Sequence, residues 1–158
     1  SNKYEYDRIG MNGRIDTIQA AVLIEKLKIF KSELINRDKL AKYYKKQFLD
    51  HGTNIKLPKV ISGATSSWAQ FTIQLPSNCN RERFQSLMRD KNIPTAIYYP
   101  IPIHCQKPYA NFPVSPDGLQ NTMHLSNCVI SLPMHPYLTP ENIDYISKTV
   151  DEIIKNIS

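Results

Sequence analysis

The segment from Gly10 to Arg14 combines residue types suited to binding an anion. Two glycines allow a tight backbone path, Asn12 offers both a hydrogen-bond donor and an acceptor, and the guanidinium of Arg14 is a planar fork that fits a carboxylate or a phosphate. Short Gly-Asn-Gly segments are also common in simple turns. Taken alone, the segment leaves two alternatives, an anion-binding loop or a turn with an exposed arginine.

A second group of aromatic and polar residues follows the end of a predicted strand. Tyr98 and Tyr99 are adjacent, and a proline-stiffened loop then brings His104 and Gln106. These side chains are suited to lining a cleft. Because neighbouring strand residues point to opposite faces, only one tyrosine should face a given pocket unless the strand has already ended. The alternative is a core tyrosine beside an edge tyrosine, with His104 hydrogen-bonded within its loop.

The sequence carries no complete catalytic motif. A third unusual segment, residues 131–136, joins a strand end to a rigid turn, in which we expect His135 to brace the loop. No glycine-rich phosphate loop follows a strand, no nucleophile elbow is present, and no carboxylate pair has a spacing that suggests hydrolysis. The residues with chemical potential therefore predict a binding surface, and they do not make a whole active site.

Cysteine and histidine spacings favour neither a disulfide framework nor a metal site. The cysteines are odd in number and widely spaced, which fits reduced thiols in a cytoplasm. No activating pattern accompanies any of them, so we predict no cysteine nucleophile. The histidines do not pair with cysteines or carboxylates at ligand spacing, so we predict no metal. The residues considered are Cys79, Cys105, Cys128, His51, His104, His124 and His135.

Composition and charge describe an ordinary soluble protein with one basic region. The 158 residues suit one domain, and 41% are hydrophobic and 22% charged. No stretch is apolar enough for a membrane span, and residues 1–7 do not form a signal peptide. Residues 1–59 hold 13 Lys or Arg against 7 Asp or Glu, which accounts for the whole net charge of +6. Acidic residues dilute this excess, so we interpret it as a solvated lysine face and expect neither a nucleic-acid nor a membrane partner.

The elements that must position these residues are helical in the first third of the chain. Asp16 and Gln19 predict a capping box, and the apolar run 20–24 predicts a first helix that is buried or lies in an interface. A second helical pattern starts near Leu27 and ends at His51-Gly52, where glycine is the natural residue just past a helix.

From residue 57 onward, strands and helices alternate. Asn80 and Thr139 are predicted helix caps, and five prolines predict an irregular loop over residues 100–118. Alternation of apolar and polar residues predicts strands, of which the first is half-buried. The predicted strands are residues 68–75, 95–99 and 128–132. This order predicts an α+β fold in which a small three-stranded sheet carries helices on one face.

Four ordered motifs together resemble the DegT-DnrJ-StrS family of pyridoxal-phosphate (PLP) dependent nucleotide-sugar aminotransferases. They are RIGMNGRIDTIQAA at 8–21, SSWAQ at 66–70, YPIPIHCQ at 99–106 and LPMHP at 132–136. Their order and spacing agree with the family across nearly the whole chain. The resemblance implies the C-terminal portion of a fold-type-I enzyme, with crossover or interface helices over residues 1–50 and a small α+β domain over residues 51–158.

The same resemblance implies a cofactor that this chain does not hold by itself. In the family, a lysine of the N-terminal domain forms the Schiff base with PLP, and that domain is not part of this sequence. Most lysines here fall on polar helix faces or in turns, whereas a Schiff-base lysine needs a desolvated pocket. We therefore expect the full-length parent to be an enzyme and the 158 residues alone to be inactive.

Position by position, the resemblance assigns binding roles to five residues. Asn12 is similar to the family asparagine that reaches the PLP phosphate of the neighbouring subunit, and Arg14 to a residue that meets a substrate anion across the same interface. Tyr99 is similar to a tyrosine of the substrate cleft, Tyr98 stands where relatives often have histidine, and His104 lies in a family motif that lines the cleft. The resemblance thus implies a homodimer.

The resemblance implies transfer of an amino group from L-glutamate to a nucleotide-linked keto sugar, for cell-surface polysaccharide or amino-sugar biosynthesis. One alternative is a PLP-dependent sugar dehydratase of the same family, in which histidine replaces the lysine. An alternative of another class is a non-catalytic basic binding module that uses residues 1–59.

Overall fold

The first element is a single long helix, α1, which spans Thr17–His51. The protein is seen in a computed structural model that describes residues 13–106, 109, 111–116 and 118–157. The two successive helices predicted here form one, because neither glycine nor proline interrupts the segment. The predicted capping box is confirmed: Asp16 Oδ1 accepts from the Ile18 N–H at 3.1 Å, and Gln19 Oε1 accepts from the Asp16 N–H at 3.5 Å.

The chain divides into two compact units, residues 1–33 and residues 34–158. Large apolar side chains are exposed along the described part of the first unit. They are Ile15, Ile18, Val22, Leu23, Ile24, Leu27, Ile29 and Phe30. Apolar surface gathered in this way is typical of a segment that packs against other protein.

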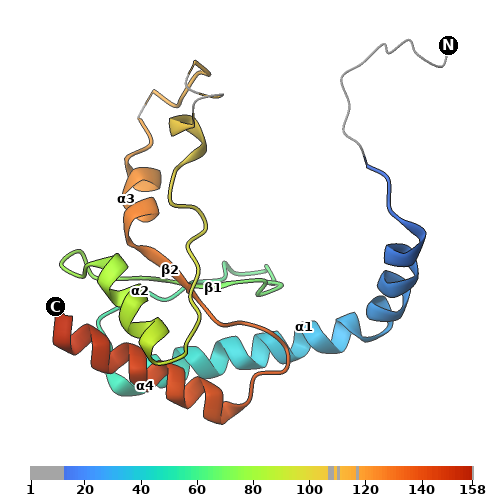
Figure 1. The fold of residues 1–158 in the computed structure, drawn as a ribbon, viewed down its shortest axis with the longest axis horizontal. Helices are drawn as coiled ribbons and strands as arrows, with labels where there is room; N and C mark the ends of the chain where they lie inside the picture. Colours follow the sequence, from blue (N-terminus) through green and yellow to red (C-terminus); the bar gives the residue numbers. More distant parts are fainter. Residues whose placement is uncertain (1–12, 107–108, 110, 117, 158) are drawn as a thin grey trace. The chain divides into compact units, whose positions relative to one another are not determined.

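The sheet of the second unit consists of two antiparallel strands (Figure 1). Strand β1 spans Phe71–Gln74 and β2 spans Val129–Leu132. The register pairs Phe71 with Leu132 and Ile73 with Ile130, so four buried apolar side chains share one face. Thr72 and Ser131 pair on the other face, where their hydroxyls lie 2.8 Å apart.

The predicted third strand over residues 95–99 is wrong. That segment makes only an isolated bridge, in which Ala96 exchanges backbone hydrogen bonds of 3.1 and 2.8 Å with Ser131. Pro94 and Pro100 bracket the segment and supply no N–H groups for a ladder. The sheet therefore ends at β2, and the chain is free to turn before Tyr98.

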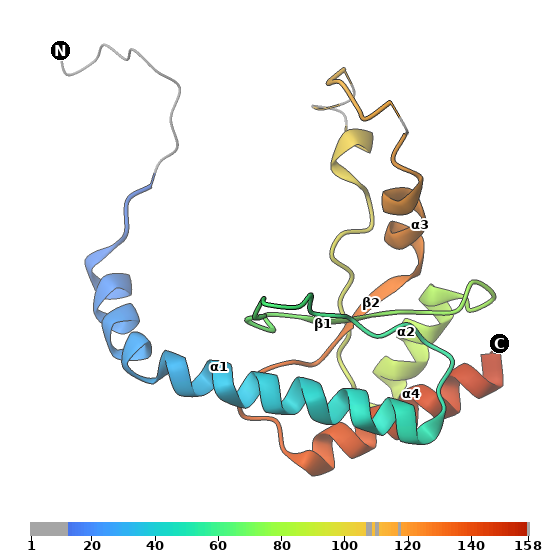
Figure 2. The same cartoon turned by 180° about the vertical axis from the view of Figure 1, so that it is seen from behind.

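Three helices complete the core beneath the apolar face of the sheet. Helix α2 spans Arg81–Asp90 and α4 spans Pro140–Ile157, and α4 lies beside the C-terminal part of α1 in both Figure 1 and Figure 2. Burying an aliphatic or aromatic side chain of this kind contributes about 1.5–3 kcal/mol. The buried helical members are Ala41, Tyr44, Phe48, Phe84, Met88, Ile143, Ile146, Val150, Ile153 and Ile154.

Local capping residues fix where α2 and α4 begin. As predicted, Asn80 caps α2, because its Oδ1 accepts from the Arg83 N–H at 2.9 Å. Thr139 precedes α4, and its hydroxyl oxygen accepts from the Asn142 N–H at 3.3 Å. Gly52, which follows α1, has φ +64°, a conformation that favours glycine.

Trp68 anchors the segment before β1 onto helix α1. Its φ of 46° is not that of a strand residue, so β1 begins later than the predicted start at residue 68, and the Trp68 ring is buried. The indole N–H donates to Asp38 at 3.1 Å, and Arg37 donates to the Trp68 carbonyl at 3.1 Å. The Lys45 ammonium lies 4.8 Å from the ring centroid, within cation–π range.

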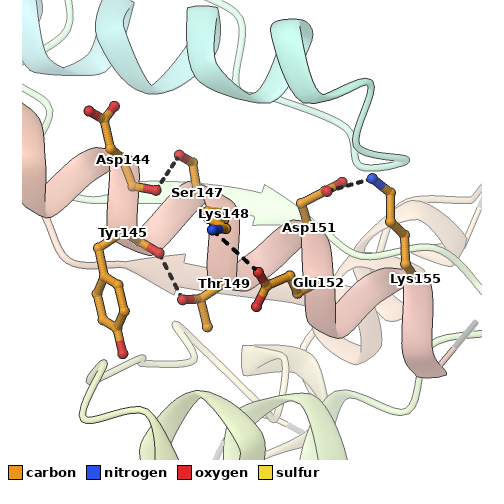
Figure 3. Close-up of polar contacts among 8 residues, drawn as sticks. All are labelled: Asp144, Tyr145, Ser147, Lys148, Thr149, Asp151, Glu152 and Lys155. Atoms are coloured by element: carbon orange, nitrogen blue, oxygen red, sulfur yellow. Dashed lines mark hydrogen bonds and ion pairs between the residues drawn. The ribbon is translucent and has the colours of Figure 1, made fainter.

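Polar contacts along α4 include one buried carboxylate (Figure 3). Asp151 is 7% exposed and accepts from Lys155 at 2.6 Å and from the Thr53 hydroxyl at 2.9 Å. Burial opposes ionisation, but the hydrogen bonds from Lys155 and Thr53 outweigh it, and the pKa of Asp151 lies below its ordinary value. This contact ties the chain just after α1 to α4.

Candidate functional site

Of Asn12 and Arg14, the two binding residues of the predicted anion-binding loop, the structure describes only Arg14. Asn12 lies outside the described residues. Arg14 is exposed and lies just before the cap of α1. Among the residues that the structure describes, the Arg14 guanidinium has no hydrogen bond or ion pair. Its five donors are therefore open to an external anion.

A cavity of about 550 Å³ opens beside the two tyrosines of the second segment. Both Tyr98 and Tyr99 line it, because the chain has left the sheet at Ala96. The tyrosines lie outside any strand, so the rule that neighbouring residues face opposite sides does not apply to them. Their rings meet edge to face, with centroids 5.8 Å apart and planes at 76°. Tyr99 is 73% exposed, so a face of its ring is open to a ligand.

The proline-rich segment after the tyrosines forms one wall of this cavity. Proline fixes φ and carries no N–H, so this wall keeps its path without ladder hydrogen bonds. The 3₁₀ turn η1, Ile103–Cys105, follows, and Gln106 just after it lines the cavity. His104 lies in this turn but is not among the described residues that line the cavity, whereas Ile103 and Gln106 are. The wall consists of Pro100, Ile101, Pro102 and Ile103.

A helix that the sequence did not predict forms another wall. Helix α3 spans Gln120–Cys128 and contributes Thr122, Leu125 and Ser126. In Figures 1 and 2, α3 and η1 lie on the side of the sheet away from α4. No side chain caps the start of α3, and its few apolar residues lack helical spacing. The one local signal is Gly118, whose φ of +66° breaks the chain just before the helix.

Arg81 holds the end of α3 against the rest of the second unit. Its guanidinium, from the first turn of α2, donates to the backbone carbonyls of Ser126 and Val129. A cation at the C-terminal end of a helix satisfies carbonyls that lack partners inside the helix and complements the helix dipole. The position of Leu125 and Ser126 in the cavity wall therefore depends on a contact between α2 and α3.

The described lining of the cavity is apolar with a few neutral polar groups. It includes no lysine, arginine, histidine, cysteine or carboxylate. Ser126 donates its hydroxyl proton to the Met123 carbonyl at 2.8 Å. The Gln106 carboxamide and the Thr122 hydroxyl have no hydrogen-bond partner among the described residues. The cavity is therefore equipped to bind and orient a molecule, and Tyr98 and Tyr99 are the described lining residues of a type that can serve in general acid–base chemistry.

A cysteine and a histidine of α3 lie close together without forming a nucleophile pair. The Cys128 thiol lies 3.7 Å from His124 Nε2, and Gln74 contacts that same nitrogen at 2.9 Å. A triad needs the two ring nitrogens of the base to serve different partners. Burial also raises the pKa of the Cys128 thiol, which lowers its reactivity. This cluster is structural.

The described residues do not fit the covalent attachment of PLP. No described lysine is buried, and none lines the cavity beside the tyrosines. A lysine nucleophile needs a desolvated environment to lower its pKa. Within the described part of the chain no group of histidine, cysteine and acidic residues is placed to hold a metal ion, and no helix is long and apolar enough to cross a membrane.

Comparison with known proteins gives one consistent family. A model of the DegT/DnrJ/EryC1/StrS aminotransferase family matches residues 1–151. A UDP-2-acetamido-2-deoxy-3-oxo-D-glucuronate aminotransferase of Pseudomonas aeruginosa is 36% identical over 91% of this chain and 38% of its own length. A dTDP-3-amino-3,6-dideoxy-alpha-D-galactopyranose transaminase of Aneurinibacillus thermoaerophilus is 33% identical over 94% of this chain and 39% of its own length.

Solved structures agree with the sequence comparisons. A DegT DnrJ EryC1 StrS aminotransferase from Brucella abortus has a TM-score of 0.80 and 38% identity, covering 94% of this chain and 38% of that one. The S. venezuelae protein DesV, solved in complex with a ketimine intermediate, has a TM-score of 0.82 and 27% identity, covering 99% and 41%. The chain thus spans about two fifths of the length of the relatives it matches.

Proposed function

Because this chain belongs to the DegT/DnrJ/EryC1/StrS aminotransferase family, we propose that a full-length protein containing it transfers an amino group from L-glutamate to a nucleotide-linked keto sugar. The family match over residues 1–151 is the observation that carries this proposal. The names of three relatives specify UDP- or dTDP-linked sugars, so a pyrimidine nucleotide is the proposed carrier. The reaction would serve surface polysaccharide or amino-sugar biosynthesis in the cytoplasm.

The proposed cofactor is PLP, held mainly by protein outside this chain. Two solved relatives at 27% identity support it, since one was solved with a ketimine intermediate and the other with bound PMP. When bound, PLP supplies the electron sink through which the amino group leaves its donor and joins its acceptor. We place the Schiff-base lysine in the part of the parent protein outside these 158 residues, and no described lysine is buried, which supports this placement. The chain alone is expected to be inactive.

The proposed contribution of this chain is to complete a site in a homodimer. Asn12 would hold the PLP phosphate of the neighbouring subunit, and Arg14 would bind an anionic group of a substrate there. The Arg14 guanidinium is exposed and has no partner among the residues that the structure describes, which supports this role. A two-fold interface would make the exchange reciprocal. Tyr98, Tyr99 and His104 would contribute the substrate cleft of the same enzyme.

The test measures amino-sugar and 2-oxoglutarate formation by the full-length protein from glutamate and a nucleotide-linked keto sugar. Losing a charge-assisted hydrogen bond at Arg14→Ala should raise the KM of the anionic substrate about 10- to 100-fold. Arg14→Lys should recover only part of this loss, because lysine keeps the charge and loses the fork. Arg83→Ala, which removes an exposed arginine of α2, should leave KM unchanged.

Two results would overturn the proposal. A wild-type protein that forms no amino sugar is not an aminotransferase, and loss of a sugar hydroxyl without consumption of glutamate would identify a dehydratase. Equal kinetics for wild type and Arg14→Ala would remove Arg14 from the site while leaving the reaction intact.

A further inference from the structure

A second cavity borders α3, and the proposed function makes no use of it. Residues 54–56 and 74–77 line it, together with His124 of α3. Its volume of about 260 Å³ is below the range of about 300–1,000 Å³ that is typical of pockets for drug-sized ligands. Its described lining shares no residue with that of the cavity beside the tyrosines. A ligand of this cavity is therefore small and occupies a separate site.

Backbone pairing places Lys56 and Gln74 on one face of the sheet. The two residues form an antiparallel bridge, with a hydrogen bond of 3.0 Å in each direction. Residues directly opposite each other in such a pair carry their side chains on the same face. The Gln74 side chain contacts His124 at 2.9 Å. The Lys56 side chain therefore lies on the same face of the sheet as the contact between Gln74 and His124.

His124 keeps one ring nitrogen for a ligand. Its structural contacts with Gln74 and Cys128 both involve Nε2, at 2.9 and 3.7 Å. Gln74 presents its carboxamide nitrogen there. Because an amide nitrogen only donates, Nε2 accepts, and the neutral ring carries its proton on Nδ1. This Nδ1–H has no hydrogen-bond partner among the described residues.

The remaining polar groups of the cavity are also donors without partners. The Lys56 ammonium, the Asn54 carboxamide and the Ser77 hydroxyl make no hydrogen bond or ion pair within the described part of the chain. The described lining holds no carboxylate. Asp151 contacts the neighbouring Thr53, but its carboxylate already accepts from Thr53 at 2.9 Å and from Lys155 at 2.6 Å. The described lining thus carries a positive charge that no lining carboxylate neutralises.

This set of groups fits an oxyanion better than a metal ion or a carboxylate. A metal cation would meet the charge of Lys56 and would find no carboxylate or thiol in the described lining. A carboxylate has two oxygens, whereas four side chains here can donate. A phosphoryl group has three or four oxygens that each accept, and lysine is a common ligand of phosphate.

We propose that this cavity binds a phosphate-type oxyanion through the Lys56 ammonium and the Nδ1–H of His124. Asn54 and Ser77 donate to its other oxygens. The bound anion joins α3 to the segment after α1, because His124 belongs to α3 and Lys56 follows the end of α1. Free phosphate and the phosphoryl group of an organic ester offer the same chemistry, so the test uses both.

The first test is a titration of the 158-residue chain with sodium phosphate at pH 7 and constant ionic strength, followed by NMR of the backbone amides. Shifts are expected at residues 54–56, 77 and 124. Lys56→Gln should weaken binding at least about 10-fold, since it removes a charge-assisted hydrogen bond, and His124→Ala about 2- to 10-fold. Both residues are exposed, so neither change should unfold the chain. Lys59→Gln removes an exposed lysine that does not line the cavity, and it should bind as wild type does.

Two further ligands define the chemistry of the site. Tighter binding of glycerol 3-phosphate than of phosphate would assign the site to a phosphate ester, and weaker or equal binding would assign it to the free ion. Acetate is the control carboxylate, and an equal response to acetate and phosphate would overturn the proposal. Phosphate shifts that persist unchanged in Lys56→Gln, or that are absent from residues 54–56 and 124, would overturn it as well.

The second test uses the full-length protein saturated with PLP, so that phosphate does not compete for the cofactor site. Replacing chloride by phosphate at constant ionic strength should raise the Tm of wild type and Lys59→Gln by the same amount, because a ligand that binds only the folded state stabilises it. The rise should be smaller in Lys56→Gln, and an equal rise in all three proteins would contradict the proposal. Neither test measures aminotransfer, so both decide the anion site even if the proposed reaction fails.

Discussion

The buried carboxylate of Asp151 allows a prediction whose size follows from its two contacts. In Asp151→Ala the Thr53 hydroxyl loses its acceptor and Lys155 loses its partner. The Lys155 side chain is 64% exposed, so screening limits that contact to less than about 1 kcal/mol. The hydrogen bond from Thr53 to a buried charged group is worth about 1.5 kcal/mol. The loss is therefore about 2 kcal/mol, or about 4–8 °C in Tm for a chain of this length.

The assay is thermal unfolding of the 158-residue chain at pH 7, followed by far-UV circular dichroism. Glu152→Ala is the matched control, because Glu152 is the next residue of α4 and its side chain is 55% exposed, with Lys148 4.0 Å away (Figure 3). An exposed substitution of this kind should shift Tm by less than about 2 °C. Equal shifts for the two variants would refute the assignment of Asp151 as a link between α4 and the end of α1.

The pH dependence of the same variants gives an independent check on the charge. The folded-state pKa of Asp151 is depressed, so the unfolded chain takes up the proton more readily, and the stabilisation present above pH 4 is lost as the pH falls through the folded-state pKa. Asp151→Asn keeps an acceptor for Thr53 and removes this titration. Its Tm should therefore fall less steeply than that of wild type between pH 5 and pH 3. The pKa of Asp38, depressed mainly by its hydrogen bond from Lys42, leaves a residual slope in both proteins.

Two further predictions concern local features of the second unit. Asn80→Ala removes the acceptor for the Arg83 N–H and should cost about 1 kcal/mol, seen as a Tm about 2–4 °C lower; an unchanged Tm would show that water replaces the cap. Cys105 is exposed, whereas Cys128 is buried and burial raises its pKa, so a thiol reagent at neutral pH should modify Cys105 first. Peptide mapping by mass spectrometry gives the order, and equally fast modification of Cys128 would contradict its burial.

The features that could be predicted from the sequence are those determined by residues that lie close together along the chain. The caps at Asp16 and Asn80 and the glycine after α1 depend on a few adjacent residues, and each is found where predicted. Alternation over residues 68–75 predicted a half-buried strand, and Phe71 and Ile73 are the alternating buried residues of β1.

The features that were missed depend on contacts between distant segments. Whether residues 95–99 pair as a strand is decided across the sheet at Ser131, and only Ala96 finds a partner there. Helix α3 is held by Arg81, more than forty positions away from the carbonyls that it contacts. The cleft-lining role of the two tyrosines could be predicted from their own segment. The roles of Thr122 and Leu125 could not, because α3 reaches the cavity only through its contact with the distant Arg81.

The anchoring of Trp68 onto α1 also gives the protein an internal optical probe. It is the single tryptophan of the chain, so intrinsic fluorescence excited at long wavelength arises from one buried ring beside Asp38 and Lys45. Emission therefore reports whether α1 is docked on the segment before β1, while circular dichroism reports all of the helices together. If α1 undocks before the helices melt, the two unfolding curves separate, and the second unit is then not a two-state folder. Coincident curves would mean that docking of α1 and formation of the core are one event.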